Sequence, residues 1–248
     1  MINVNRVDFV ALPVSDLGRA DAFYGETLGL ARNPETSGER WVEYETGNLT
    51  LALSTFGGCI AIGVDDVAET RADLEGTGVE FNNETFDSGV CNGAGFTDPV
   101  GNPLLLHHRY APLEHWEPPA GEFQRTDFIG VPVTDRPQGM DFYGGTLGLA
   151  RNERSSDEWP EFEPGNATIL LNTPEQTGDT FKAGNYSISL RVADVAATMD
   201  RLREAGIEFE FPQVYDSSVC HMAFFEDPDG NSLILHHRYK PYSDGSMP

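Results

Sequence analysis

The sequence predicts an α+β fold in which one β-α-β-β unit occurs four times, as two tandem domains. The first observation is an internal repeat: residues 6–33 align with 125–152 at 16 identities in 28 positions, and residues 96–112 align with 225–241 at 12 in 17. The second is that strand-like and helix-like hydrophobic patterns alternate within each copy. Because the predicted strands outnumber the helices, the pattern indicates an α+β class rather than a doubly wound sheet.

The repeat also sets the expected domain boundaries. We expect a first domain over residues 1–112, a linker over 113–124, a second domain over 125–241 and a C-terminal tail over 242–248. The second copy is longer by about ten residues, roughly at 173–185. This insert is polar and contains glycine, so it predicts a longer surface loop, and a loop there could act as a lid.

The first half of each copy begins with a strand, which in copy one covers residues 8–14. Asp16 can cap the helix that follows, in which apolar residues recur at helical spacing until Gly29 ends it. Two strand-like runs come next, at 40–45 and 49–54. The Thr-Gly-Asn sequence between these runs predicts a hairpin.

The second half repeats this order. Residues 59–64 form an expected strand, Asp66 caps a helix, and Gly78 ends that helix. Two further strands are expected at about 89–97 and 103–110, joined by an Asp-Pro-Val-Gly-Asn turn.

The charge balance excludes several partners. The chain has 40 Asp and Glu residues against 16 Lys and Arg residues, a formal net charge of −24. This field repels phosphate backbones and anionic headgroups, so we expect neither nucleic acid nor a membrane surface as partner. No apolar run is long enough to span a membrane and no signal core opens the chain, so we expect a cytoplasmic protein. The acidic, lysine-poor composition favours a halophilic origin over an ordinary acidic protein.

The three cysteines, Cys59, Cys91 and Cys220, form no C-x-x-C pair and predict free thiols. Cys220 precedes His221, which raises the hypothesis of a nucleophile. Adjacent residues of a strand point to opposite faces, however, and Asn92 stands at the position of His221 in copy one. The pattern therefore favours Cys91 and Cys220 as small buried hydrophobes, while His221 could still line the second cavity.

Short motifs occur in the same order in both copies. In copy one they are Val14-Ser15-Asp16, Phe23-Tyr24-Gly25, Leu28-Gly29-Leu30, Val64-Asp65-Asp66-Val67 and Phe96-x-Asp98-Pro99-x-Gly101-Asn102. With these motifs the chain resembles the vicinal oxygen chelate superfamily, which includes glyoxalases, bleomycin-resistance proteins and extradiol dioxygenases. The resemblance implies four βαβββ modules that form two domains, each with a cup-shaped mixed sheet around a small-molecule cavity.

The resemblance also locates the superfamily's metal ligands. The matched motifs place them at Phe9, Cys59 and Leu105 in copy one, and at Phe128, Ser187 and Ile234 in copy two. A divalent metal needs several imidazole or carboxylate ligands, which these six positions do not supply. We therefore expect no cofactor and no metal at the usual site, and these residues instead become candidate ligand contacts.

A His-His-Arg-Tyr tetrad is identical in the two copies. If Leu105 and Ile234 point into the cups, His107 and His236, two residues further along each strand, do so too. Their imidazoles are candidate general acids or bases, or hydrogen-bond partners of a ligand. In the alternative, structural interpretation the tetrad closes the last strand, with Arg109 and Arg238 paired to the retained aspartates Asp8 and Asp127.

Two glutamates share the expected cup face. Glu43 and Glu161 occur in a recurring Trp-x-Glu-x-Glu sequence, whose period of two places Trp and both Glu residues on one side of a strand. Either carboxylate could bind a cationic ligand. A displaced divalent metal site would combine Glu43 with His107, or Glu161 with His236, although a solvated glutamate is the commoner outcome in an acidic protein.

Two functions remain open from the sequence. The first is binding of a small aromatic or cationic organic molecule without metal, similar to the bleomycin-resistance branch. The alternative is a dioxygenase-, isomerase- or lyase-type enzyme that uses the cavity histidines or a relocated metal. The insert favours the second copy as the active one, and a degenerate copy that only stabilises the other is a third possibility. Four modules in one chain are compatible with a monomer or a homodimer.

Overall fold

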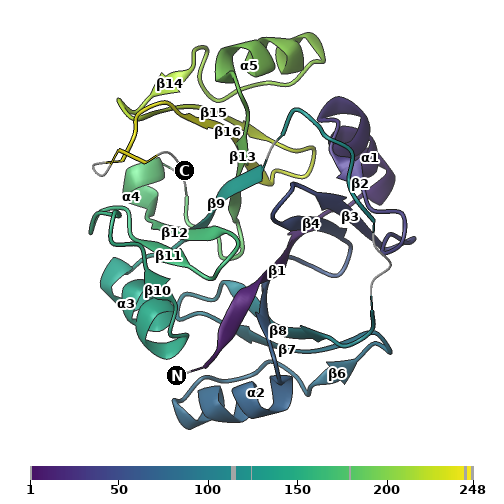
Figure 1. Ribbon diagram of the computed structural model, residues 1–248, viewed down its shortest axis with the longest axis vertical. Coiled ribbons are helices and arrows are strands. Elements are labelled where there is room, and N and C mark those ends of the chain that lie inside the picture. Colours follow the sequence, from purple (N-terminus) through teal and green to yellow (C-terminus); the bar gives the residue numbers. More distant parts are fainter. Residues whose placement is uncertain (1, 113–115, 124, 179, 243–244, 247–248) are drawn as a thin grey trace.

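Each copy of the repeat forms its own eight-stranded sheet in the computed structural model, which describes residues 2–112, 116–123, 125–178, 180–242 and 245–246 (Figure 1). The expected linker and tail therefore lie only partly within the described residues. The strand order is β2-β3-β4-β1-β5-β8-β7-β6 in the first sheet and β10-β11-β12-β9-β13-β16-β15-β14 in the second. The predicted α+β class and the predicted duplication are confirmed.

The first sheet contains β1 (Val4–Pro13), β2 (Ala31–Arg32), β3 (Trp41–Glu45), β4 (Thr50–Ser54), β5 (Cys59–Val64), β6 (Phe86–Asp87), β7 (Cys91–Thr97) and β8 (Pro103–Arg109). The second contains β9 (Arg125–Pro132), β10 (Ala150–Arg151), β11 (Glu161–Glu163), β12 (Thr168–Asn172), β13 (Ser187–Arg191), β14 (Tyr215–Asp216), β15 (Cys220–Glu226) and β16 (Ser232–Arg238). β1 pairs in parallel with β4 and antiparallel with β5, so each sheet is mixed and joins two βαβββ modules.

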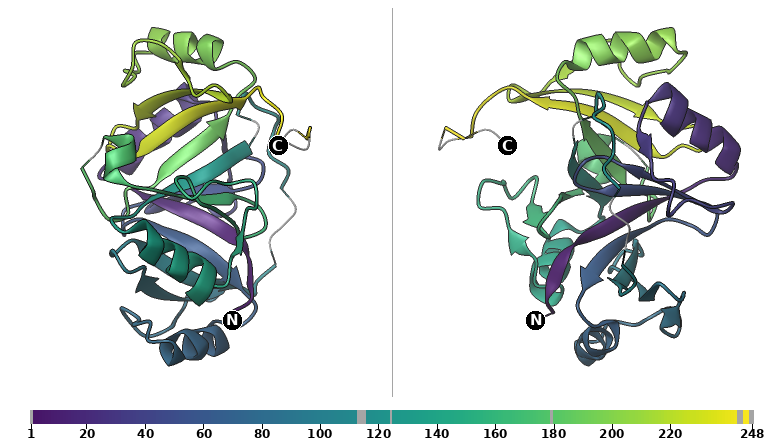
Figure 2. Two further views of the ribbon diagram at one scale, coloured as in Figure 1. Left: turned by 90° about the vertical axis from the view of Figure 1, so that its left-hand side faces the viewer. Right: turned by 45° about the vertical axis from the view of Figure 1, so that its right-hand side comes forward.

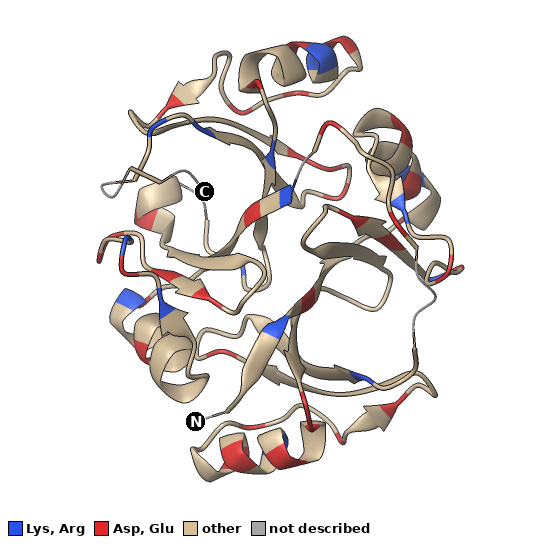
Figure 3. Cartoon of the chain, in the orientation of Figure 1, with Lys and Arg blue, Asp and Glu red and all other residues tan. Residues whose placement is uncertain are grey.

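The helices lie on the outer side of the sheets. They are α1 (Leu17–Asp21), α2 (Val67–Gly76), α3 (Arg136–Met140), α4 (Pro174–Thr177) and α5 (Val195–Glu204). Asp66 caps α2 as expected. The buried residues of this helix, Val67, Thr70 and Leu74, face β7 and β8. Figures 1 and 2 show α2 and α5 at opposite ends of the molecule. Figure 3 shows acidic residues along the outer surface of α2, where Glu69, Asp73 and Glu75 are exposed. No helix in the described part of the chain is long and apolar enough to span a membrane.

The first helix of each copy differs from the prediction of one regular helix. α1 continues as the π-helix η1 (Ala22–Thr27), and α3 continues as η2 (Asp141–Thr146). The wider turn, closed by Leu28 N–H donating to Phe23 O, buries both Phe23 and Tyr24, which are neighbours in sequence. The insert also departs from a plain loop, because its first residues form the short helix α4.

The two domains are joined through the turns that end in Gly-Asn. The Asp227 carboxylate is 5% exposed and accepts hydrogen bonds from Asn231 of its own turn and from Tyr24 of the first domain, the latter at 2.9 Å. Asp98 is held in the same way by Asn102, at 2.7 Å, and by Tyr143 of the second domain, at 3.2 Å. Each turn therefore completes its hydrogen bonds with a tyrosine from the other domain.

A second set of reciprocal contacts lies between the two hairpin turns. The Asn48 side chain donates to Asn166 O at 2.7 Å and to Thr126 O at 2.9 Å. The Asn166 side chain donates in turn to Asn48 O at 2.7 Å and to Val7 O at 2.9 Å. The two side chains thus satisfy backbone groups of β1 and β9 beyond the ends of their pairing with β4 and β12, and they join the domains at this point.

The interface can be tested by removing one hydroxyl. We expect Tyr24→Phe to lower the free energy of unfolding by about 1–3 kcal/mol, because the buried Asp227 carboxylate loses a donor. The measurement is urea unfolding followed by circular dichroism. Tyr110→Phe is the matched control, because it removes an exposed bond to Asp87 and should change stability little. Equal effects of the two substitutions would show that the interdomain bond does not stabilise the fold.

Candidate functional site

The concave face of the first sheet presents Phe9, Leu105 and His107. Phe9 and Leu105 both lie opposite Ala61 of the central strand β5, and the Phe9 ring meets the His107 imidazole edge-on with centroids 5.2 Å apart. In the second sheet Phe128 and Ile234 lie opposite Ser189, and the rings of Phe128 and His236 are 5.5 Å apart. The expected alternation along the last strand is therefore present in both cups.

A β-bulge brings an aspartate to the same face. In the pairing of β1 with β5, Val7 lies opposite Ile62 and Phe9 opposite Ala61, so Asp8 is an extra residue. Asp127 is the extra residue of β9 in the second sheet. A bulge redirects a side chain that regular alternation would send to the opposite face. Both aspartates therefore reach the histidines of the cups.

Asp8, His107 and Cys91 form a connected group in the first cup. His107 Nδ1 donates to Asp8 Oδ2 at 2.6 Å. Cys91 lies on the same face of the sheet, diagonal to His107 in the register of β7 and β8, and the two groups interact electrostatically. Ser88 Oγ lies 3.1 Å from Cys91 Sγ.

The second cup repeats the group with Asp127, His236 and Cys220. His236 Nδ1 donates to Asp127 Oδ2 at 2.5 Å, and Ser217 Oγ lies 3.0 Å from Cys220 Sγ. Cys220 lies diagonal to His236 on the same face of the sheet, and the two groups interact electrostatically. The sequence pattern favoured both thiols as small buried hydrophobes. Cys220 is buried and Cys91 is half-buried, and both lie beside the cup histidines, which the pattern did not predict. The available signal was that Asp, Cys and His recur together at matched positions of the repeat.

These contacts favour charged histidines and thiolates. Burial alone would lower the pKa of His107, but the hydrogen bonds to Asp8 and Cys91 raise it from 6.5 to about 9. Burial likewise opposes the shift in His236, whose pKa is raised to about 9 by Asp127 and Cys220. The hydrogen bond with His107 lowers the pKa of the Cys91 thiol. The pKa of Cys220 is lowered too, because its bonds with His236 and Ser217 outweigh the effect of burial.

The rest of the tetrad is structural, but not in the predicted way. Asp8 pairs with His107 and Arg6, and Asp127 with His236 and Arg191, so the predicted pairing with Arg109 and Arg238 is wrong. Each arginine lies two positions after its histidine, about 7 Å further along β8 or β16 and opposite the cysteine of the neighbouring strand. His108 and His237 bond the carbonyls of Val64 and Val192 on the helix side, as expected. Tyr110 and Tyr239 donate to Asp87 and Asp216.

The positions of the superfamily's metal ligands do not fit a metal. Phe9 and Leu105 carry no donor atom, and burial raises the pKa of the Cys59 thiol to about 12. In the second cup Phe128 and Ile234 are equally without donors, and Ser187 offers one hydroxyl. Within the described ranges, no three His, Cys, Asp or Glu side chains are arranged to hold a metal ion.

The two glutamates are already hydrogen-bonded. The Trp41 indole donates to Glu43 at 2.6 Å, and its ring packs edge-on against Phe9 with centroids 5.2 Å apart. Asn152 donates to Glu161 at 2.8 Å. Trp159 departs from the predicted shared face, because β11 begins only at Glu161 and the Trp159 side chain is 40% exposed. The aromatic wall of the first cup is therefore missing from the second.

His221 does not line the second cup. It lies opposite His237, whereas Cys220 and Met222 flank it on the other face of β15, with Met222 opposite His236. Its imidazole lies beside the Tyr239 ring and 4.0 Å from Asp216. Because neighbouring strand residues point to opposite faces, His221 lies on the face of β15 that is turned away from the cup and from Cys220.

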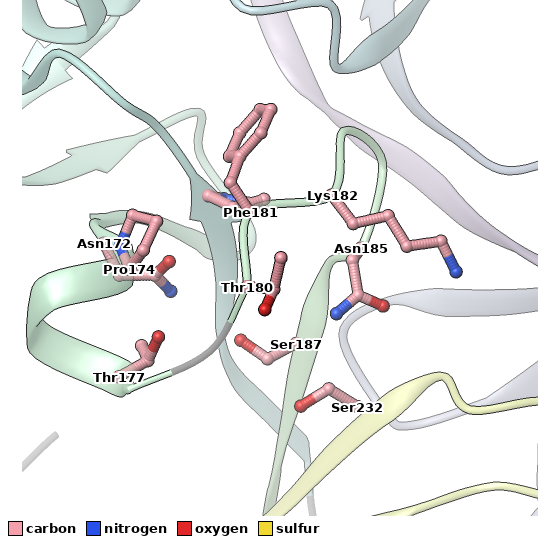
Figure 4. Close-up of a pocket in the computed structure, with 10 residues that line it drawn as sticks. Asn172, Pro174, Thr177, Thr180, Phe181, Lys182, Asn185, Ser187 and Ser232 are labelled. Carbon is pink, nitrogen blue, oxygen red and sulfur yellow. The ribbon is translucent and has the colours of Figure 1, made fainter.

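The insert covers one end of the second cup. Figure 4 shows Phe181, Lys182 and Asn185 on one side of a small cavity, with Ser187 and Ser232 on the other. Its volume of about 40 Å³ holds a few water molecules, not an organic ligand. Gly184 N–H donates to Asn102 of the first domain at 2.8 Å, so this segment is tied across the interface.

A larger hollow of about 450 Å³ lies between the domains. Its lining includes Arg6 and Arg125, which pair with Asp8 and Asp127. Glu45 and Thr50 of the first cup and residues of both hairpin turns complete the lining. This volume is within the range of small-molecule sites.

The fold agrees with comparisons to known proteins. Residues 6–106 and 125–235 match the Glyoxalase/Bleomycin resistance protein/Dioxygenase superfamily, and the chain belongs to this superfamily. A comparison with curated protein sequences gives no match.

Solved structures show the same architecture. The Mn(II)-bound glyoxalase from Novosphingobium aromaticivorans is 16% identical with a TM-score of 0.69, over 100% of this chain and 87% of that one. Homoprotocatechuate 2,3-dioxygenase from Arthrobacter globiformis is 18% identical with a TM-score of 0.69, over 94% and 80%. The Brevibacterium fuscum enzyme in complex with 3,4-dihydroxyphenylacetate is 17% identical with a TM-score of 0.70, over 98% and 82%. At these identities the likeness is one of fold.

The charge of the cup histidines can be measured. We expect the imidazole NMR signals of His107 and His236 to titrate near pH 9, and that of His107 to move toward 6.5 in Asp8→Asn. Because folding stabilises the imidazolium, its contribution to stability is complete below pH 6.5 and is lost as the pH rises through about 9. His236 is the internal control in Asp8→Asn. A midpoint near 6.5 for His107 in the wild-type protein would contradict the assignment.

Proposed function

We propose that the chain binds a small aromatic or cationic organic molecule in its cups without the metal site of the superfamily. The observation that carries the proposal is the first cup. There, Phe9 and Leu105 replace metal ligands, and Phe9 and Trp41 pack edge to face as one apolar wall. Aromatic walls with a few polar groups are typical of sites for flat organic ligands.

An aromatic cation suits the first cup best. The faces of Phe9 and Trp41 attract a cation, and the carboxylate of Glu43 lies next to the indole. The second cup is more polar and more basic, since Ser189 and Arg191 replace Ala61 and Gly63 of the first. We therefore assign the aromatic cation to the first cup, and this choice replaces the expectation from the insert that the second copy is the active one.

The binding proposal is tested with benzyltrimethylammonium and its uncharged analogue neopentylbenzene. In EDTA-treated protein we expect saturable quenching of Trp41 fluorescence by the cation, and weaker quenching by the neutral compound. Phe9→Ala should weaken binding about tenfold because the ring contact is lost. Phe56→Ala, at a side chain 66% exposed, is the control. Trp41→Phe identifies the responding indole. Failure of both compounds to bind the metal-free protein would count against the proposal.

The second candidate is an enzyme, favoured by the Asp–His pair found in both cups. Its dioxygenase form would consume oxygen with 3,4-dihydroxyphenylacetate, the compound bound by the Brevibacterium fuscum relative. Since the metal-ligand positions lack donors, we expect no oxygen uptake and no stoichiometric iron after incubation with Fe(II). An oxygen electrode and metal analysis of the desalted protein check this. Iron-dependent uptake that His236→Ala abolishes, while His237→Ala keeps it, would establish the enzyme instead.

A further inference from the structure

We propose that Cys91 and Cys220 are nucleophilic thiolates that add to small electrophilic compounds of the conjugated enone class. This covalent activity goes beyond reversible ligand binding. Its reacting groups, the thiols and imidazoles, are not those on which the binding proposal depends, so either proposal can fail while the other holds.

Strand register places each thiol beside its imidazole. His107 lies opposite Gly93, and Cys91 lies two residues from Gly93 on the same strand, so Cys91 and His107 share one face of the sheet as diagonal neighbours. Gly93 carries no side chain between them. In the second cup Met222 lies opposite His236, and Cys220 occupies the diagonal position.

A carboxylate orients each imidazole toward its thiol. The hydrogen bond from His107 Nδ1 to Asp8 leaves Nε2 as the nitrogen available to Cys91. This chain of thiol, imidazole and carboxylate is the arrangement that activates nucleophilic cysteines in enzymes of unrelated folds. Asp8 acts as a positioning residue, and room for it is provided by Gly63, where an added Cβ would come within 2.9 Å of the carboxylate.

A tight turn presents each thiol in the same way. The Ser88 hydroxyl accepts from the backbone N–H of Cys91 at 3.1 Å, and Gly89 adopts a φ of 84°. In the second copy Ser217 accepts from Cys220 N–H at 3.0 Å, and Ser218 takes the same left-handed conformation with a φ of 67°. Ser218 is the one described residue other than glycine with positive φ. The turn is therefore maintained even where the residue type is unfavourable.

The surrounding charges favour a thiolate. Arg109 lies opposite Cys91 in the strand register, and Arg238 lies opposite Cys220. The hydrogen bond with His107 and the nearby Arg109 lower the pKa of Cys91, and the corresponding groups lower that of Cys220. The groups around the first thiol are Arg6, Asp8, Asp87, His107, Arg109 and Tyr110. Those around the second are Asp127, Glu161, Arg191, Asp216, His236, Arg238, Tyr239 and Tyr242.

Cys59 provides the contrast within the same chain. It is partly exposed like Cys91, but burial of its sulfur raises its pKa to about 12, and its pKa has no other cause of shift. Its thiol is therefore inert at neutral pH. Differences between Cys91 and Cys59 report on the imidazole rather than on the presence of a thiol.

In the proposed addition of the thiolate to an enone, the imidazolium supplies the proton. The thiolate sulfur forms a bond to the β-carbon of the enone, and the carbon–carbon π electrons move to give an enolate. The imidazolium Nε2–H then protonates the α-carbon, which leaves a neutral thioether and a neutral histidine. No group leaves and no oxidant or metal is required. The neighbouring Phe9 ring and Leu105 supply an apolar surface for a flat enone.

The test is the pH dependence of alkylation by N-ethylmaleimide, a small cyclic enone, followed by mass spectrometry of each cysteine peptide. An ordinary thiol reacts about a hundredfold faster at pH 7.5 than at pH 5.5, because its thiolate fraction changes by that factor. We expect the rate at Cys91 to rise clearly less than a hundredfold over this range, because the neighbouring imidazole lowers its pKa. Cys220, which is 8% exposed, should show the same flattened profile at a lower rate. A hundredfold rise at Cys91 in the wild-type protein would overturn the proposal.

Paired variants separate the imidazole from other effects. His107→Gln should restore the hundredfold rise and slow alkylation of Cys91 at pH 6 at least tenfold, since the thiolate loses its partner. His108→Gln, next in sequence but bonded to Val64 O on the other face, should leave the profile unchanged. Equal profiles in the two variants would overturn the proposal. If His107→Gln does not fold, the profile of Cys91 against Cys59 in the wild-type protein still decides.

A further variant distinguishes the two proposals. Cys91→Ser should lose the N-ethylmaleimide adduct at this position but keep the quenching by benzyltrimethylammonium. A flattened alkylation profile at Cys91 in a protein that binds neither benzyltrimethylammonium nor neopentylbenzene would support the thiolate and overturn the binding function. Binding of benzyltrimethylammonium without a flattened alkylation profile at Cys91 would support the binding function and overturn the thiolate proposal.

Discussion

The architecture depends on two buried carboxylates that neither domain can satisfy alone. Asp98 and Asp227 sit in turns at the interface, and each completes its hydrogen bonds with a tyrosine from the other domain. Loss of a donor to a buried charge is costly, so separation of the domains would leave each carboxylate with only the bonds of its own turn. This reciprocity explains why the Phe-Tyr and Asp-Pro-x-Gly-Asn motifs are kept in both copies. It also makes the pair of domains, rather than the single domain, the unit of stability.

The bulged residues Asp8 of β1 and Asp127 of β9 bring a carboxylate to the histidine of each cup. Without the bulge, Asp8 and Asp127 would alternate to the face opposite Phe9 and Phe128 and could not orient the histidines. The bulged aspartate has different neighbours in the two domains. Gly63 leaves space around Asp8, whereas Arg191 occupies the matching position and pairs with Asp127. The first cup is thus more apolar and the second more basic, although the two domains share one fold.

The sequence predicted much of the fold and of the candidate site. Period-two patterns placed His107 on the same face as Leu105, and this placement is correct because strand alternation is local. Local alternation also failed at specific points. It took Asp8 for a partner of Arg109, since a bulge depends on pairing with a distant strand. It treated Cys91 as a core residue, because the diagonal contact with His107 depends on the register of β7 against β8.

The sequence by itself determined the duplication, the α+β class and the order of the elements, because repeats and periodicity are properties of the chain. Tertiary structure decided which side chains act together. The Asp–His–Cys groups join residues about a hundred positions apart, and the bonds of Tyr24 and Tyr143 join residues of different domains. Strand register, bulges and domain packing set these contacts, and none of the three is a local property of the chain.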